Sequence, residues 1–224
     1  MNISISVIIA FAAKTLTAAG IAYALLQLYG KKWLETQFSK KLEDHKGKIN
    51  ALFSRISKIH EKEFEVLPEA WRLLQHALGL VSALASPLKT YPDINRMNPA
   101  EFDGFLATTR LNDLDKKALA SASDRNKFFQ ERIFWYDLQD AREAVNAFHN
   151  YTILNKIFMT KELFDAFKAV DDLLMDTILE QEIGTEAGDR SMTRNYYKTT
   201  RTQIEPLVAN IEVLVQERLH HAEA

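Results

Sequence analysis

Residues 3–29 form an apolar run that contains one charged side chain, Lys14, and is followed at once by Lys31 and Lys32. At about 1.5 Å of rise per residue, a helix of this length crosses a hydrocarbon core of roughly 30 Å with some tilt. Basic residues directly behind an apolar run are typical of the cytoplasmic flank of a membrane span. The sequence therefore predicts a transmembrane helix over residues 1–30.

Two other interpretations of this run fit less well. A cleaved signal peptide has a basic start and an unbroken apolar centre, whereas no charged side chain precedes Lys14 and this residue splits the centre. A buried helix of a soluble domain is normally shorter and has a polar face.

The charges behind the run predict its orientation. Residues 31–62 contain nine basic residues against four acidic ones (31, 32, 40, 41, 46, 48, 55, 58 and 62 against 35, 43, 44 and 61). The more basic side of a span stays in the cytoplasm. We therefore expect a bacterial inner-membrane protein with a single span, its N-terminus outside, and a cytoplasmic domain over residues 31–224.

Small and polar residues recur in the run at alternating steps of four and three, and so share one helix face (Ser6, Ala10, Ala13, Thr17, Gly20, Ala24 and Gln27). Such faces let helices approach closely in lipid, which predicts a homo-oligomer; chance is the alternative, since small residues are common in spans. Lys14 borders this face. It either snorkels toward the outer surface or lines a water-filled pore between copies.

The remaining composition predicts an ordered helical domain. Only 12 of 224 residues are Gly or Pro, and no segment alternates with the period of two that strands require. The chain has no Cys, which excludes disulfides, thiolate zinc sites and Cys catalysis. It also lacks a P-loop, a dinucleotide glycine fingerprint, His-Glu-x-x-His and Gly-x-Ser-x-Gly. We expect an all-α bundle without cofactor or metal.

Apolar residues at helical spacing continue beyond the run (Leu34, Phe38, Leu42, Leu52, Ile56 and Ile59, with His45 and Ile49 between them). They predict that the span and the first cytoplasmic helix form one rod. Pro68 is expected to start or kink a helix that reaches about Ser86. Residues 73–88 are apolar but too short to span, so we assign them to the core, with a second membrane contact as the alternative.

Further helices are expected from Pro99 to about Thr109 with Asn98 as its cap, and from about Ser123 to Phe158. A turn near Asn112 separates them. Thr160 should open a helix that ends near Gly184. Gly188 and Asp189 should open the last helix, which Pro206 kinks.

The helix that Thr160 opens is crowded with acids (Asp165, Asp171, Asp172, Asp176, Glu180, Glu182, Glu186 and Asp189). Without a nearby His and with loose spacing, they favour a solvated face over a divalent metal site. Four cations follow on one face (Arg190, Arg194, Lys198 and Arg201), beside Tyr196 and Tyr197. This ridge could bind phosphates or RNA bases, but packing of consecutive helices favours pairing with the acids.

One arrangement has a catalytic appearance. Arg142 and His149, separated by six residues, lie on a polar helix face about 10 Å apart along the axis. Arg55 and His60 have similar spacing. The spacing resembles that of the HEPN ribonucleases, and this resemblance implies that the Arg stabilises the scissile phosphate and the His transfers protons.

This spacing is the signature of HEPN ribonucleases, and the layout of one N-terminal span before a helical domain resembles the membrane-embedded accessory proteins of RNA-targeting CRISPR systems. The resemblance implies a HEPN-like fold and assembly into membrane pores. Glu143 departs from the neutral residue common after the Arg, which weakens the case for cleavage. The segment RISKIHEKEFEVLPEAW also resembles an uncharacterised bacterial family of single-span helical proteins.

These observations lead to three hypotheses. The first is a non-enzymatic, homo-oligomeric antiviral effector that permeabilises the membrane when its cytosolic domain is triggered. The second is a membrane-tethered HEPN-like ribonuclease that uses Arg142 and His149. The third is a membrane scaffold without catalysis that recruits a protein partner through the long rod.

Overall fold

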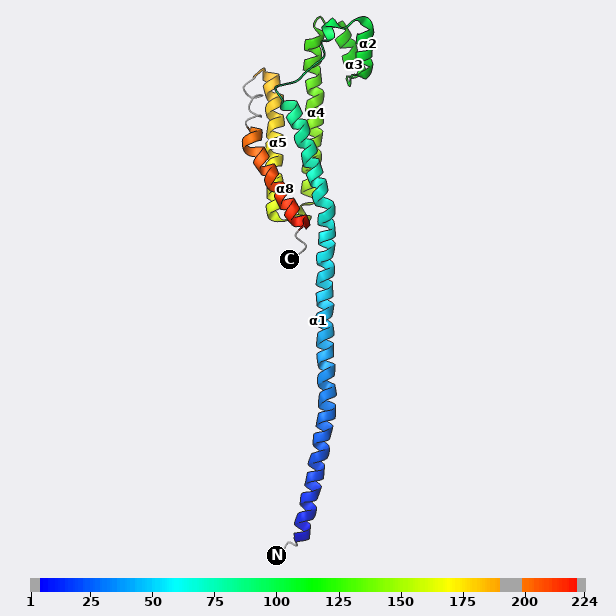
Figure 1. Cartoon of the computed structure of the whole chain (residues 1–224), viewed down its shortest axis with the longest axis vertical. Helices are drawn as coiled ribbons and strands as arrows, with labels where there is room; N and C mark the ends of the chain where they lie inside the picture. The colour runs from blue at the N-terminus through cyan, green and yellow to red at the C-terminus, as the bar shows by residue number, and fades with distance from the viewer. Residues whose placement is uncertain (1–4, 190–198, 221–224) are drawn as a thin grey trace. The chain divides into compact units, whose positions relative to one another are not determined.

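The computed structural model describes residues 5–189 and 199–220, and their side chains except at 5–19, 21, 25, 28, 29 and 201. Every regular element in this part of the chain is helical, so the predicted all-α class is confirmed (Figure 1). The elements are α1 (Ile5–Ala85), η1 (Ile94–Arg96), α2 (Pro99–Thr108), α3 (Asp113–Ser121), α4 (Arg125–Leu154), η2 (Lys156–Phe158), α5 (Lys161–Ala187), η3 (Thr200–Ile204) and α8 (Glu205–His220).

The chain divides into two compact units, residues 1–59 and 60–224. The first unit contains the N-terminal part of α1, and the second contains all the other helices. Among the described residues, no helix is both long enough and apolar enough to cross a membrane. Most of the expected span lies outside the described side chains, and the predicted boundary at residue 30 stays a prediction.

Helix α1 is continuous from Ile5 to Ala85, which confirms that residues 31–67 prolong the helix of the apolar run. Pro68 lies inside α1, so the expectation that it could start a new helix is wrong. A proline in a helix removes one backbone hydrogen bond and crowds the preceding turn. The side chains of Leu67 and Ala70 are fully buried beside it, and their packing offsets this cost.

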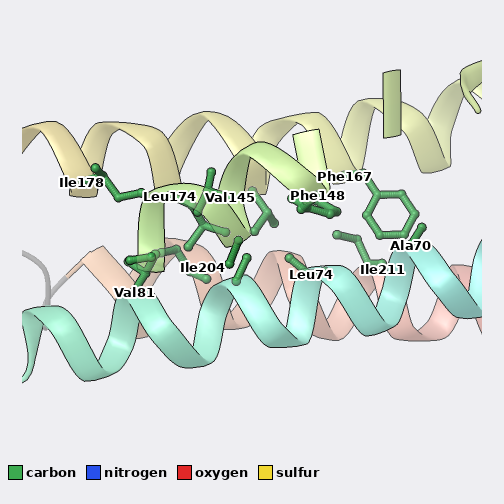
Figure 2. Close-up of a cluster of buried hydrophobic side chains, with 14 of the residues drawn as sticks. Ala70, Leu74, Val81, Val145, Phe148, Phe167, Leu174, Ile178, Ile204 and Ile211 are labelled. Carbon is green, nitrogen blue, oxygen red and sulfur yellow. The ribbon is translucent and has the colours of Figure 1, made fainter. Parts of the chain in front are cut away.

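The core of the second unit lies where α1, α4, α5 and α8 pack together. Figure 2 shows Leu74 and Val81 from α1 facing Leu174 and Phe167 from α5, all of them fully buried. Phe148 of α4 meets Phe167 edge to face at 5.9 Å between ring centres. Residues 73–88 contribute Leu74, Val81 and Leu84 to this core, as the sequence predicts.

A smaller core joins α2 and α3 to the beginning of α4 (Ile94, Phe102, Leu111, Leu119, Phe129 and Ile133). The predicted cap at Asn98 is confirmed, because its side-chain oxygen accepts from the backbone N–H of Glu101. The Glu101 carboxylate in turn accepts from the backbone N–H of Asn98. Asn112 caps α3 in the predicted turn region. These caps satisfy backbone donors that the first helical turn leaves unpaired.

The loop before α2 is held by Asn126 of α4. Its side-chain oxygen accepts hydrogen bonds from the backbone N–H groups of Ile94 and Asn95, at 2.6 and 3.2 Å. Its amide nitrogen donates to Asp93 at 2.8 Å. The irregular stretch between α1 and α2 is therefore held by a helix.

Helix α5 begins after Thr160, whose side chain caps it as predicted, but it ends at Ala187 and not near Gly184. Gly188 has φ +69° and terminates the helix, since a left-handed residue suits glycine. Gly188 was expected to open the last helix. Residues 190–198 lie outside the described part, and the chain resumes with the π-helical η3 before Pro206 in the first turn of α8.

Candidate functional site

The predicted catalytic pair lies on α4, and both side chains reach α5. Arg142 Nη2 donates to Glu182 Oε2 at 2.5 Å. His149 Nδ1 lies 2.6 Å from Asp171 Oδ2, with the His side chain 44% exposed and the Asp side chain 7% exposed. The two residues thus share one side of α4, as their spacing predicts, and each faces an acid.

The His149–Asp171 pair has a geometry that acid–base chemistry can use. A buried carboxylate bound to Nδ1 fixes the orientation of an imidazole and leaves Nε2 as the nitrogen that exchanges protons with a substrate. The second oxygen, Asp171 Oδ1, is buried and has no hydrogen-bond partner among the described residues, and the same is true of Thr152 Oγ1. A buried water could satisfy such groups.

Arg142 is less suited to bind a phosphate. Its guanidinium already pairs with Glu182, and the two side chains are 36% and 26% exposed. An incoming phosphate would have to displace a carboxylate that brings its own negative charge. The arrangement therefore favours a structural pairing of α4 with α5 over a ready anion site.

A second His–acid contact was not predicted. Glu63 of α1 is buried; its Oε2 lies 2.8 Å from His60 Nδ1, and its Oε1 accepts from Arg218 Nη2 of α8 at 2.8 Å. His60 belongs to the second Arg–His spacing noted in the sequence, and here it serves this cluster. No local pattern in the sequence indicates the ion pair between Glu63 and Arg218, because 155 positions separate them.

The acids of α5 have several roles rather than one. Lys161 pairs with Asp165 at 2.7 Å and Lys168 with Asp172 at 2.5 Å, each four residues away. The hydrogen bonds raise the pKa of both lysines. No group of three or more potential ligands in the described residues could hold a metal ion.

The predicted basic ridge cannot be placed, because Arg190, Arg194 and Lys198 lie outside the described residues, as does the side chain of Arg201. For the predicted span interface, the side chains of Ala13, Lys14 and Thr17 also lie outside them. Gly20 and Ala24 are exposed. No described atom from elsewhere in the chain lies within 4 Å of the position that a side chain at Gly20 would take.

The second unit also has a hollow that sequence reasoning missed. Its volume is about 710 Å³, and it lies between the end of α1, the following loop, α4 and α5. Tyr91, Phe134 and Trp135 supply aromatic walls. Lys89 at its edge pairs with Asp137 at 3.3 Å. The lining comes from three stretches that are far apart in the sequence, so no motif could indicate it.

The first unit has an unusual surface. All side chains of residues 31–59 are exposed in the described structure, including the apolar ones that recur at helical spacing. We call this row of side chains the exposed seam; it consists of Leu34, Phe38, Leu42, His45, Ile49, Leu52, Ile56 and Ile59. Its apolar members are between 49% and 70% exposed.

The exposed seam is accompanied by cations. Lys41, Lys48 and Arg55 follow one another at steps of seven and lie along one side of it. Lys46 lies on the other side. Sequence reasoning found the seam, but not the regularity of this basic row.

Comparison of the chain with protein-family models, with curated proteins and with solved structures finds no match. The resemblance to the membrane-embedded accessory proteins of CRISPR systems is therefore neither supported nor opposed by a relative.

Proposed function

We propose that the protein is a membrane-anchored helical scaffold that binds a partner protein along the first unit of α1. One observation carries the proposal: the exposed seam runs from Leu34 to Ile59 and nothing in the described residues covers it. Monomeric proteins rarely expose apolar surface continuously, and such surfaces mark interaction sites.

The energetics of an isolated helix support the same proposal. Helices are marginal in water when no packing covers an amphipathic face, because propensity alone contributes little. Seven apolar side chains are about half exposed or more along the seam. A partner that covers them would stabilise the helix as it binds.

The anchor is the apolar run over residues 3–29, with the exposed seam on the cytoplasmic side of a bacterial inner membrane. Length, apolar content and the basic flank support this placement. The small and polar residues on one face of the run, Gly20 among them, support close packing of spans from several copies.

The two other hypotheses have less support. A ribonuclease needs Arg142 for the phosphate, and that residue is paired with Glu182. An effector that permeabilises membranes needs a pore lined by a face of the span, and the exposed seam beyond the span has no role in such a pore. Both stay predictions.

Site-specific crosslinking in intact cells tests the scaffold. A photoreactive residue at Leu52 lies in the seam, whereas one at Ser54 lies on the opposite face and serves as the control. We expect an adduct from Leu52 and none from Ser54, in a membrane fraction that resists alkaline extraction. Absence of an adduct at both positions would refute partner binding, and extraction by alkali would refute the anchor.

The proposed packing of spans has its own test. Gly20→Ile places a branched side chain where the structure has open space, and should separate the copies if spans pack there. The size of the detergent-solubilised protein is the measurement. An oligomer that survives Gly20→Ile would be held together elsewhere.

A further inference from the structure

The charges around the exposed seam indicate which kind of partner it binds, an inference that rests on the proposed function. From Leu42 to Ile59 the seam advances by three, four, three, four and three residues (Leu42, His45, Ile49, Leu52, Ile56 and Ile59). This is the a and d pattern of a coiled coil, whose flanking e and g positions select the partner.

Every charged residue at these flanking positions is basic. Lys41, Lys48 and Arg55 occupy successive g positions, and Lys46 and Phe53 occupy e positions. All of these side chains are exposed. The two acids of the segment, Glu43 and Asp44, fall at the outer b and c positions, where they cannot contact a partner helix.

A second copy of the chain is a poor occupant for this surface. In a parallel pair the g position of one helix faces the e position five residues on in the other, which sets Lys41 against Lys46. In an antiparallel pair g faces g, so that Lys48 and Arg55 meet only cations. Both arrangements place like charges together and gain no ion pair.

A lipid surface is also a poor occupant. Helix α1 has no break between the apolar run and Ile59. If residues 3–29 cross the bilayer, the unbroken helix carries residues 42–59 away from it, at about 1.5 Å per residue. The Debye length of about 8 Å at physiological salt leaves most of these cations beyond the attraction of the headgroups.

We propose that the seam from Leu42 to Ile59 binds an amphipathic helix of another protein, with apolar residues at a and d and acidic residues at e and g. Glutamates at those positions pair with Lys41, Lys48 and Arg55 while the apolar rows interlock. Phe53 widens the apolar contact on the e side. The cations thus both attract this partner and oppose pairing between copies.

Two synthetic helices test the proposal against the full-length protein in lipid nanodiscs. Both carry Ile at a and Leu at d over four heptads. The Glu peptide has Glu at every e and g position, and the Lys peptide, which is the control, has Lys at the same positions. Fluorescence anisotropy of the labelled peptides measures binding. We expect the Glu peptide to bind at least about tenfold more tightly than the Lys peptide.

Charge reversal provides a matched pair of variants. K48E/R55E reverses two cations beside the seam, and K40E/K58E reverses two on the opposite side with the same change of net charge. K48E/R55E should weaken the Glu peptide by about tenfold and strengthen the Lys peptide, whereas K40E/K58E should change either affinity less than about threefold. Circular dichroism of each variant reports whether its helix content is retained.

Equal binding of both peptides, or equal effects of the two variants, would overturn the proposal. So would a Leu52 crosslink whose adduct is a dimer of the chain itself, or quenching of a label at Phe53 by a quencher in the lipid tails. A Leu52 adduct without peptide binding would leave the scaffold standing and reject only its acidic partner. Peptide binding by a chain that alkali extracts would reject the anchor instead.

Discussion

The two parts of α1 have similar apolar spacing and opposite environments. Between Leu34 and Ile59 the apolar side chains are about half exposed or more, whereas from Val66 to Leu84 the apolar row is buried in the core of the second unit. The buried part contains Ala70 and Ala77, small residues that let neighbouring helices approach. Its only charged side chains are Glu69 and Arg72, while the exposed part has basic flanks. Spacing thus identifies the apolar face, and the flanking residues indicate what kind of surface covers it.

We expect the largest effect on the free energy of unfolding from a substitution in the buried core, and almost none from one in the exposed part. Phe167→Ala removes a fully buried ring that contacts Phe148, and should lower the free energy of unfolding by about 3 to 5 kcal/mol. Phe38→Ala, at a side chain that is 70% exposed, should change it by less than about 0.5 kcal/mol. Denaturant unfolding followed by circular dichroism measures both. A comparable loss for Phe38→Ala would mean that the exposed part is already covered within the protein.

The buried charge of Glu63 gives the next effect. Glu63→Ala removes the acceptor of Arg218 and His60, and should lower the free energy of unfolding by about 2 to 3 kcal/mol. The loss is no larger because the partially exposed Arg218 can turn to solvent. Glu61→Ala, two residues away at an exposed position, is the control and should be nearly neutral. Thermal unfolding reports the difference. Equal melting temperatures would show that the ion cluster contributes little to the bundle.

A smaller effect is expected at the α4–α5 pair. Arg142→Ala should cost about 1 kcal/mol or less, since its ion pair with Glu182 is partly exposed. If the pair is catalytic, Arg142→Ala and His149→Ala should each abolish RNA cleavage while the domain stays folded. Cleavage of a labelled RNA and thermal unfolding are measured side by side. Wild-type protein that cuts no RNA would reject the ribonuclease hypothesis.

The smallest effect concerns pH. The backbone N–H of Lys127 and the side chain of Asn95 bind Asp124, and they lower the pKa of its carboxyl. A lowered folded-state pKa adds stability that is present above the unfolded value of about 3.9 and is lost as the pH falls through the folded value. Asp124→Asn keeps a capping side chain but cannot titrate. Its stability between about pH 5 and 2 should fall less steeply than that of the wild type; parallel profiles would contradict this.

The sequence predicts local structure well where the cause is local. Asn98 and Thr160 carry the side-chain acceptors that start helices, and both cap them in the structure. Asn112 also caps a helix, α3, where the sequence predicts only a turn. Gly184 was a less secure guide to a helix end, because a glycine stops a helix only where the backbone turns left-handed, as Gly188 does.

The candidate sites depend on distant parts of the chain, and that limited prediction. The spacing of Arg142 and His149 predicts that they share a helix face, but it does not predict which acids of α5 they contact. Arg218 reaches Glu63 only because α8 packs beside α1 in the second unit. The row of the exposed seam could be predicted from its spacing, whereas the exposure of its side chains is seen only in the described structure.

The fastening of the loop by Asn126 has a consequence for hydrogen exchange. The amide protons of Ile94 and Asn95 are bound to a side chain that α4 holds, so they exchange with solvent only when the loop parts from that helix. Asn95 in turn accepts from the Arg125 backbone N–H at 2.9 Å, at the first residue of α4. We therefore expect the loop and the start of α4 to open as one cooperative segment, so that a stretch rich in proline shares the protection of the helix that it precedes.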